Sequence, residues 1–196
     1  AIGYFSLGSN TTGSGNIAIG AVALNTNLTG SNTTVIGYNG LINATASSNT
    51  AIGAIVGPDL TSGTLNTLIG YNTGGGIITG NYNTIIGSQV SGLTGSMSNN
   101  IILADGQGNI RIHTISNGDT GFTTDTPTAR IHVVGSGNTS ATYAAKFDNS
   151  SAVSIFYIRN DKRIIYTDGN EGAGKVLTSD ASGIATWQTS SSGTVN

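Results

Sequence analysis

Asn83-Thr84-Ile85-Ile86-Gly87 belongs to a short motif that recurs along the first half of this chain. Close copies are Asn49-Thr50-Ala51-Ile52-Gly53 and Asn66-Thr67-Leu68-Ile69-Gly70, and looser ones are Asn16–Gly20 and Thr33–Gly37. The motif glycines stand at positions 3, 20, 37, 53, 70 and 87, so their spacings are 17, 17, 16, 17 and 17. A fixed short period predicts a solenoid, in which each repeat forms one turn and packs on its neighbours.

The residues within each repeat favour short strands and tight turns. β-Branched Ile positions are separated by Gly, Asn and Ser, which are typical turn residues. No 3.6-residue periodicity is long enough to predict a helix. We therefore expect an all-β fold with about six turns of parallel β-coil over residues 1–104 and two short strands in each turn.

Stacked turns would place equivalent residues above one another at roughly 4.8 Å, the distance between neighbouring strands. The repeat predicts an aliphatic ladder and an amide ladder that hydrogen-bonds at the turn. The aliphatic ladder comprises Ile2, Ile19, Ile36, Ile52, Ile69, Ile86 and Ile102. The amide ladder comprises Asn16, Asn49, Asn66, Asn83 and Asn99.

One chain offers few other regular aliphatic positions from which to build a core. The second aliphatic residue of the turn drifts along the repeats, through Leu7, Leu24, Leu41, Val56, Ile78 and Val90. We therefore expect the Ile ladder to be buried by association, with three copies around an axis as the simplest closed form. On this interpretation Ile69→Asn disrupts the fold.

Charge divides the chain in two. The whole chain is 8% charged, against roughly 25% for an ordinary soluble protein, and residues 1–104 contain one charged side chain, Asp59. A boundary near residue 104 follows. A net charge of −2 gives no electrostatic basis for binding nucleic acid, and no run approaches the ~20 apolar residues of a membrane helix. A polysaccharide depolymerase needs paired carboxylates, which residues 1–104 lack.

The Asn-Thr-x-Ile-Gly phrases resemble the head repeats of YadA-like trimeric adhesins and related repeats in phage tail fibres and bacterial surface fibres. The resemblance covers about residues 1–104 and recurs in register. It implies a left-handed parallel β-roll, three of which pack into a homotrimeric head. The repeat of 16–17 residues is longer than the family's usual unit, so longer outer loops are expected. The implied setting is extracellular, on a virion tail fibre or a bacterial surface.

The charged half continues the fibre resemblance. Residues 101–112 predict a strand, an Asp-Gly turn and a second strand, and residues 105–134 form a junction. Strands are expected at about 142–148, 152–159 and 163–167 within a shaft segment, 135–169. Apolar residues on both faces of these strands favour burial between neighbouring chains. The glycine- and serine-rich segment 170–196 resembles fibre sequences that precede a distal tip or chaperone. The chain also opens within a repeat, so we expect it to be part of a longer protein.

Three motifs could carry other chemistry, and simpler interpretations are favoured for each. Gly169 to Lys175 matches the start of a phosphate-binding loop, but Val176 replaces the expected Ser or Thr. His113 and His132 lack partners for a triad or a zinc site. Asp105, Gln107 and Asn109 alternate like calcium ligands without a later Glu. We predict no catalytic, cofactor or metal site.

The predicted function is structural and adhesive. The segment would space and present a receptor-binding tip, in contact with other segments of the fibre, and would serve cell adhesion or recognition of a host or prey surface. The alternative is a carbohydrate-binding module that acts through exposed tyrosines, Tyr4, Tyr38, Tyr71 and Tyr82. A protein receptor on the cell surface is also compatible with either role.

Overall fold

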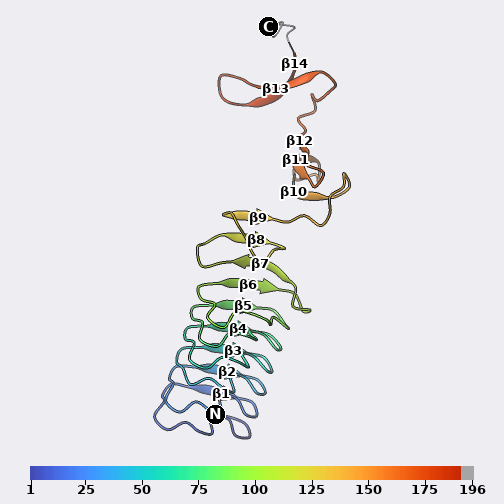
Figure 1. Ribbon diagram of the computed structural model, residues 1–196. Helices are drawn as coiled ribbons and strands as arrows, with labels where there is room; N and C mark the ends of the chain where they lie inside the picture. Colours follow the sequence, from blue (N-terminus) through green and yellow to red (C-terminus); the bar gives the residue numbers. More distant parts are fainter. Residues whose placement is uncertain (191–196) are drawn as a thin grey trace. The chain divides into compact units, whose positions relative to one another are not determined.

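The computed structural model describes residues 1–190, and this range contains strands but no helix. In unit 1, residues 1–134, the strands are β1 (Ile17–Ile19), β2 (Thr34–Ile36), β3 (Thr50–Ile52), β4 (Thr67–Ile69), β5 (Thr84–Ile86), β6 (Ile101–Ala104), β7 (Ile110–Thr114), β8 (Thr120–Phe122) and β9 (Ile131–Val133). They form one nine-stranded sheet in chain order. Because β1 to β6 pair in parallel, the fold of this unit is the predicted all-β parallel solenoid (Figure 1).

Each turn contains one strand, so the prediction of two strands per turn is wrong. Left-handed residues interrupt the opposite wall: Leu24 and Leu41 have φ of 51° and 44°, and Gly57 and Gly74 occupy the next turns. A residue with positive φ cannot continue an extended strand. The wall nevertheless keeps its contacts between turns, because Leu24 N donates to Gly40 O at 2.9 Å and Leu41 N to Val56 O at 2.9 Å.

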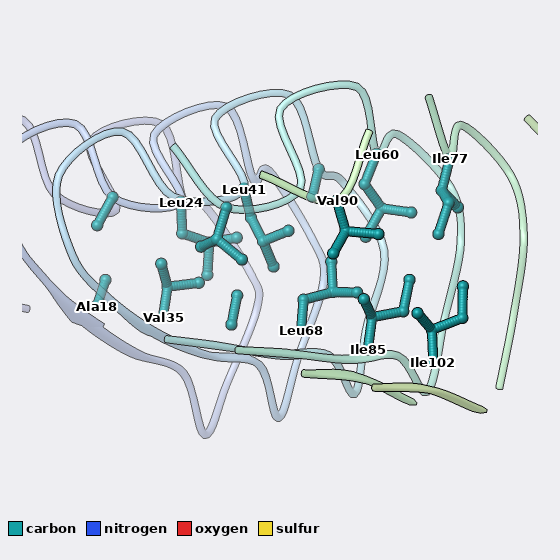
Figure 2. Packing of buried hydrophobic residues seen from close by; sticks show 14 residues of the cluster. Ala18, Leu24, Val35, Leu41, Leu60, Leu68, Ile77, Ile85, Val90 and Ile102 are labelled. Carbon is teal, nitrogen blue, oxygen red and sulfur yellow. The ribbon is translucent and has the colours of Figure 1, made fainter. Parts of the chain in front are cut away.

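The core of the solenoid lies inside a single chain (Figure 2). The middle residue of each strand points inward and is fully buried: Ala18, Val35, Ala51, Leu68, Ile85 and Ile102. The remaining walls contribute Leu24, Leu41, Val56, Leu60, Ile77 and Val90, all buried. This corrects the expectation that one turn has too few aliphatic residues for a core. It also replaces Ile78, which is exposed, with its neighbour Ile77.

A column of glycines follows the strands and sets how closely the turns approach. Gly20, Gly37, Gly53 and Gly70 have φ between 130° and 140°. A Cβ on Gly37 would lie 2.2 Å from the carbonyl oxygen of Gly53, and a Cβ on Gly53 would meet Gly70 in the same way. Only glycine fits, because both the conformation and the space exclude a side chain.

The carboxyl end of the sheet changes direction. The β6–β7 hairpin is antiparallel and contains the predicted turn at Asp105-Gly106, with Ile102 opposite His113. Strand β8 pairs antiparallel with β7, and β9 then pairs parallel with β8. The last turn of the solenoid is therefore covered by hairpin strands of the same unit.

Unit 2 begins at Gly135 and contains two small sheets. The first joins β10 (Tyr143–Asp148), β11 (Ser154–Arg159) and β12 (Ile164–Tyr166), close to the ranges expected from the sequence. The second pairs β13 (Lys175–Ser179) with β14 (Ala185–Thr189), and Trp187 Nε1 donates to Tyr166 O at 2.7 Å. The last six residues of the predicted segment 170–196 lie outside the described residues. Within residues 1–190 no helical stretch has the length and apolarity that a membrane span requires.

Candidate functional site

The outward face of strands β1 to β6 carries a regular aliphatic column. The third residue of each strand stacks on the next, and the register joins Ile19, Ile36, Ile52, Ile69, Ile86 and Leu103. These side chains project from the sheet, and Ile36 and Ile86 are 39% and 42% exposed. We call this set the aliphatic column. It ends in Leu103 where the sequence interpretation placed Ile102, because Ile102 pairs with Ile85 and faces the core.

A second outward column lies beside the first. The first residue of each strand forms it, and four successive turns place a threonine there: Thr34, Thr50, Thr67 and Thr84. Alternation along a strand sends the first and third residues to the same face, so hydroxyl and aliphatic columns together form one uncharged surface. Ile17 and Ile101 occupy the two ends of the threonine column and are about half exposed.

The tyrosines proposed as a contact surface do not form a single column. Tyr4, Tyr38 and Tyr71 each follow a motif glycine and share one column on alternate turns. The register is fixed by backbone bonds: Ile55 N donates to Tyr38 O at 2.8 Å, and Gln89 N to Tyr71 O at 2.7 Å. Tyr82 precedes its strand instead, in the column of Leu65 and Asn99. All four tyrosines are exposed.

The central part of the predicted amide ladder, from Asn49 to Asn83, forms a continuous chain of hydrogen bonds. Asn66 Nδ2 donates to Asn49 Oδ1 at 3.1 Å, and Asn83 Nδ2 donates to Asn66 Oδ1 at 3.0 Å. Each Oδ1 also accepts the backbone N–H of the next Asn, as Asn83 Oδ1 does from Asn100 N at 3.1 Å. These Asn side chains are buried and satisfied within the fold, so their role is structural.

The two ends of the ladder differ from the prediction. The last member is Asn100, because Asn99 is exposed with φ of 60°. The repeat spacing could have identified Asn100 as the last member, because Asn100 lies 17 residues after Asn83 and Asn99 lies only 16 residues after it. At the other end, Thr33 N donates to Asn16 Oδ1 at 3.0 Å, and Thr33 fills the rung between Asn16 and Asn49.

His113 covers the end of the amide ladder, a role that the sequence did not reveal. The imidazole is 6% exposed; its Nε2 lies 2.9 Å from Asn100 Oδ1, and its Nδ1 donates to Asp125 O at 2.8 Å. It therefore occupies the place of the next rung and ties it to the loop after β8. The pairing of β6 with β7 brings these distant residues together.

The acidic turn at Asp105 is organised by the protein itself. Its Oδ1 accepts hydrogen bonds from the backbone N–H groups of Gln107 and Asn109, and its Oδ2 accepts two from Arg111. The side chain of Asn109, these backbone groups and Arg111 hold the pKa of Asp105 well below its usual range. Donors already occupy the carboxylate, which leaves no set of oxygen ligands directed at a cation.

The remaining motifs are dispersed. The loop from Gly169 to Lys175 leads directly into strand β13, and Lys175 Nζ donates to the carbonyl of Asn170 rather than facing an open nest. His132 Nδ1 accepts a long bond of 3.3 Å from Thr128 N. Among residues 1–190 no three His, Asp or Glu side chains converge as a metal site would require. The uncharged outward face of strands β1 to β6 is therefore the candidate functional surface of this chain.

Comparisons with family models, with curated proteins and with solved structures found no match to this chain.

Proposed function

We propose that this chain is a structural and adhesive segment of a homotrimeric fibre, of the kind found in phage tail fibres and bacterial trimeric adhesins. The observation that carries the proposal is the aliphatic column, whose members are exposed apart from the half-buried Ile69, although the solenoid has its own buried core. Six aliphatic side chains in unbroken register make a continuous apolar stripe, and stripes of this kind mark surfaces that bind a partner.

A second and a third copy of this chain are the partners that fit the stripe best. Identical solenoids have the same rise per turn, so their columns remain in register along the whole face. A partner without that repeat would lose register after a few turns. Three copies that direct their columns towards one axis form a closed assembly, with each column packed against the other two. The motif resemblance supports the same arrangement of left-handed rolls.

Unit 2 supports a shaft role in its own right. Its sheets are small, and large apolar side chains remain exposed on them: Phe147 at 55%, Ile155 at 42% and Ile164 at 69%. Burial of these residues between neighbouring chains would explain why one chain leaves them uncovered. In this role the segment spaces and presents a receptor-binding tip outside the cell and contacts the host or prey surface.

Light scattering behind a sizing column tests the proposal. The wild-type chain is expected at three times 19.7 kDa. The double variant Ile52→Asn/Ile69→Asn is expected at the single-chain mass with an unchanged circular dichroism spectrum, because both residues lie outside the core. The matched control, Leu28→Asn/Ile78→Asn, replaces two exposed aliphatic side chains that lie outside both outward columns and should remain a trimer. A wild-type mass of one chain would refute the trimer.

A further inference from the structure

The column that follows the motif glycines alternates with a period of two turns. Its residues in order are Tyr4, Ala21, Tyr38, Ala54, Tyr71 and Ser88. The next residue is Asn39 or Asn72 beside the two central tyrosines and Val22 or Ile55 beside the alanines, whereas the end turns have Phe5 beside Tyr4 and Gln89 beside Ser88. Backbone bonds between turns, such as Asn39 N to Ala21 O at 3.0 Å and Asn72 N to Ala54 O at 2.9 Å, fix this order in space.

The alternation places two exposed tyrosines two turns apart, and we call the interval between their side chains, over Ala54, the slot. Tyr38 and Tyr71 are 57% and 53% exposed, and the turn between them presents only the methyl group of Ala54. Two turns separate the tyrosine backbones by about 9.5 Å, which leaves room for one puckered six-membered ring with carbon contacts of about 4 Å on each side. A tyrosine on every turn would have closed the slot.

A polar residue directly follows each tyrosine that borders the slot, Asn39 after Tyr38 and Asn72 after Tyr71. The side-chain amides of Asn39 and Asn72 make no hydrogen bond within the part of the chain that the structure describes, and both residues are partly exposed. An amide offers two donors and an acceptor, a combination that suits sugar hydroxyls. The C–H faces of a sugar ring pack on a tyrosine ring, whose face carries partial negative charge.

The lack of cationic side chains in the solenoid narrows the chemical class of the ligand further. Residues 1–104 contain no Lys, Arg or His, so the column has no cation with which to hold a sulfate, phosphate or carboxylate group. We propose that Tyr38 and Tyr71, with Asn39 and Asn72, bind a neutral oligosaccharide whose ring enters the slot above Ala54. The proposal rests on the proposed function for its setting, since a fibre at a cell surface meets glycans, while the slot itself belongs to a single solenoid.

The test is binding of the full chain to a panel of immobilised oligosaccharides. The panel contains neutral β-linked glucose, N-acetylglucosamine and mannose oligomers, with sulfated and sialylated glycans for comparison. The variants are Tyr38→Ala/Tyr71→Ala, the filled slot Ala54→Tyr, and the control Tyr82→Ala, which removes an exposed tyrosine from a different column. The mass of each variant is measured in parallel.

Binding of at least one neutral oligomer is expected, and Tyr38→Ala/Tyr71→Ala and Ala54→Tyr should each bind about tenfold more weakly or not at all. Tyr82→Ala should bind like the wild type. Absence of neutral-glycan binding, a preference for anionic glycans, or full binding by the double variant would overturn the proposal. Loss of the wild-type mass in the tyrosine variants would also overturn it, because the column would then belong to the contact between copies. A wild-type monomer that binds through the slot would refute the proposed trimer and leave the proposed glycan site standing.

Discussion

Single residues in this solenoid are constrained first by backbone conformation. Residues 15, 32, 48, 65, 82 and 99 form a left-handed column with φ between 57° and 69°. Glycine and asparagine adopt this conformation readily, whereas a left-handed backbone costs other residues about 1–2 kcal/mol. Leu65 is the aliphatic member of this column and is 48% exposed, so little packing offsets the strain.

The change Leu65→Asn should therefore stabilise the solenoid by about 1 kcal/mol, because Asn32 occupies the same position two turns earlier. Urea unfolding followed by circular dichroism measures the difference. The reverse change, Asn32→Leu, should destabilise it by a similar amount. A lower stability for Leu65→Asn would show that contacts of the leucine outweigh its backbone strain.

His113 offers a second test at the level of one side chain. The change His113→Leu removes both ring contacts, deprives Asp125 O of the hydrogen bond from Nδ1 and leaves the buried Asn100 side chain without its polar neighbour, which should destabilise unit 1 by about 2–4 kcal/mol. The matched change His132→Leu removes only a long bond at a less buried position and should cost less than about 1 kcal/mol. Thermal unfolding compares the two; equal losses would mean that the cap adds nothing.

At the scale of the strand, alternation separates two aliphatic residues that stand side by side. Leu68 is fully buried and Ile69 points outward. The change Leu68→Asn should destabilise the monomeric fold by about 3–5 kcal/mol, because it buries an amide and leaves a cavity. Ile69→Asn should spare the fold and weaken association instead. Circular dichroism and light scattering on both variants separate these effects, and loss of structure in Ile69→Asn alone would reverse the assignment.

The same strand explains what the sequence could and could not predict. The period of the motif predicted the parallel solenoid and the hydrogen bonds between Asn side chains of successive turns, because repetition in sequence becomes stacking in space. The period did not identify the core. The buried position of each strand changes residue type from turn to turn, for example Ala18 and Leu68, while the outward Ile beside it recurs. A core tolerates exchange of size between layers, whereas the regular column lies outside. The His113 contact depends on a hairpin after the last repeat, which no period describes.

At the scale of the whole molecule, the distribution of carboxylates predicts which part of the chain responds to low pH. The pKa of Asp148 is lowered by hydrogen bonds from Lys146 and Ser154. Burial raises the pKa of Asp168, but hydrogen bonds from Asn170 and Trp187 outweigh burial and give a net lowering. With Asp105, all three carboxylates lie beyond residue 104, whereas residues 1–104 contain only Asp59.

A lowered pKa in the folded state stabilises the fold above the ordinary Asp value near 4, and this contribution is lost as pH falls below it. Amide NMR signals of residues 105–111 should therefore stay constant through the ordinary Asp range and begin to shift only well below pH 4, while those of β2 to β5 stay constant throughout. The stability difference between wild type and Asp105→Asn should be constant above about pH 5 and shrink in acid. Parallel shifts throughout the solenoid would contradict this separation.

The glycine column also governs how such a molecule can change in length. Each motif glycine lies against the backbone of the next one, so the distance between successive turns leaves no room for a side chain at this position. A residue lost from the outer loop is tolerated, as between Gly37 and Gly53, where 16 residues suffice and Thr34 still pairs with Thr50. An insertion that keeps both outward columns intact must therefore add a complete turn. The solenoid can therefore lengthen only by whole turns, and duplication of one repeat would extend its outward face by one turn.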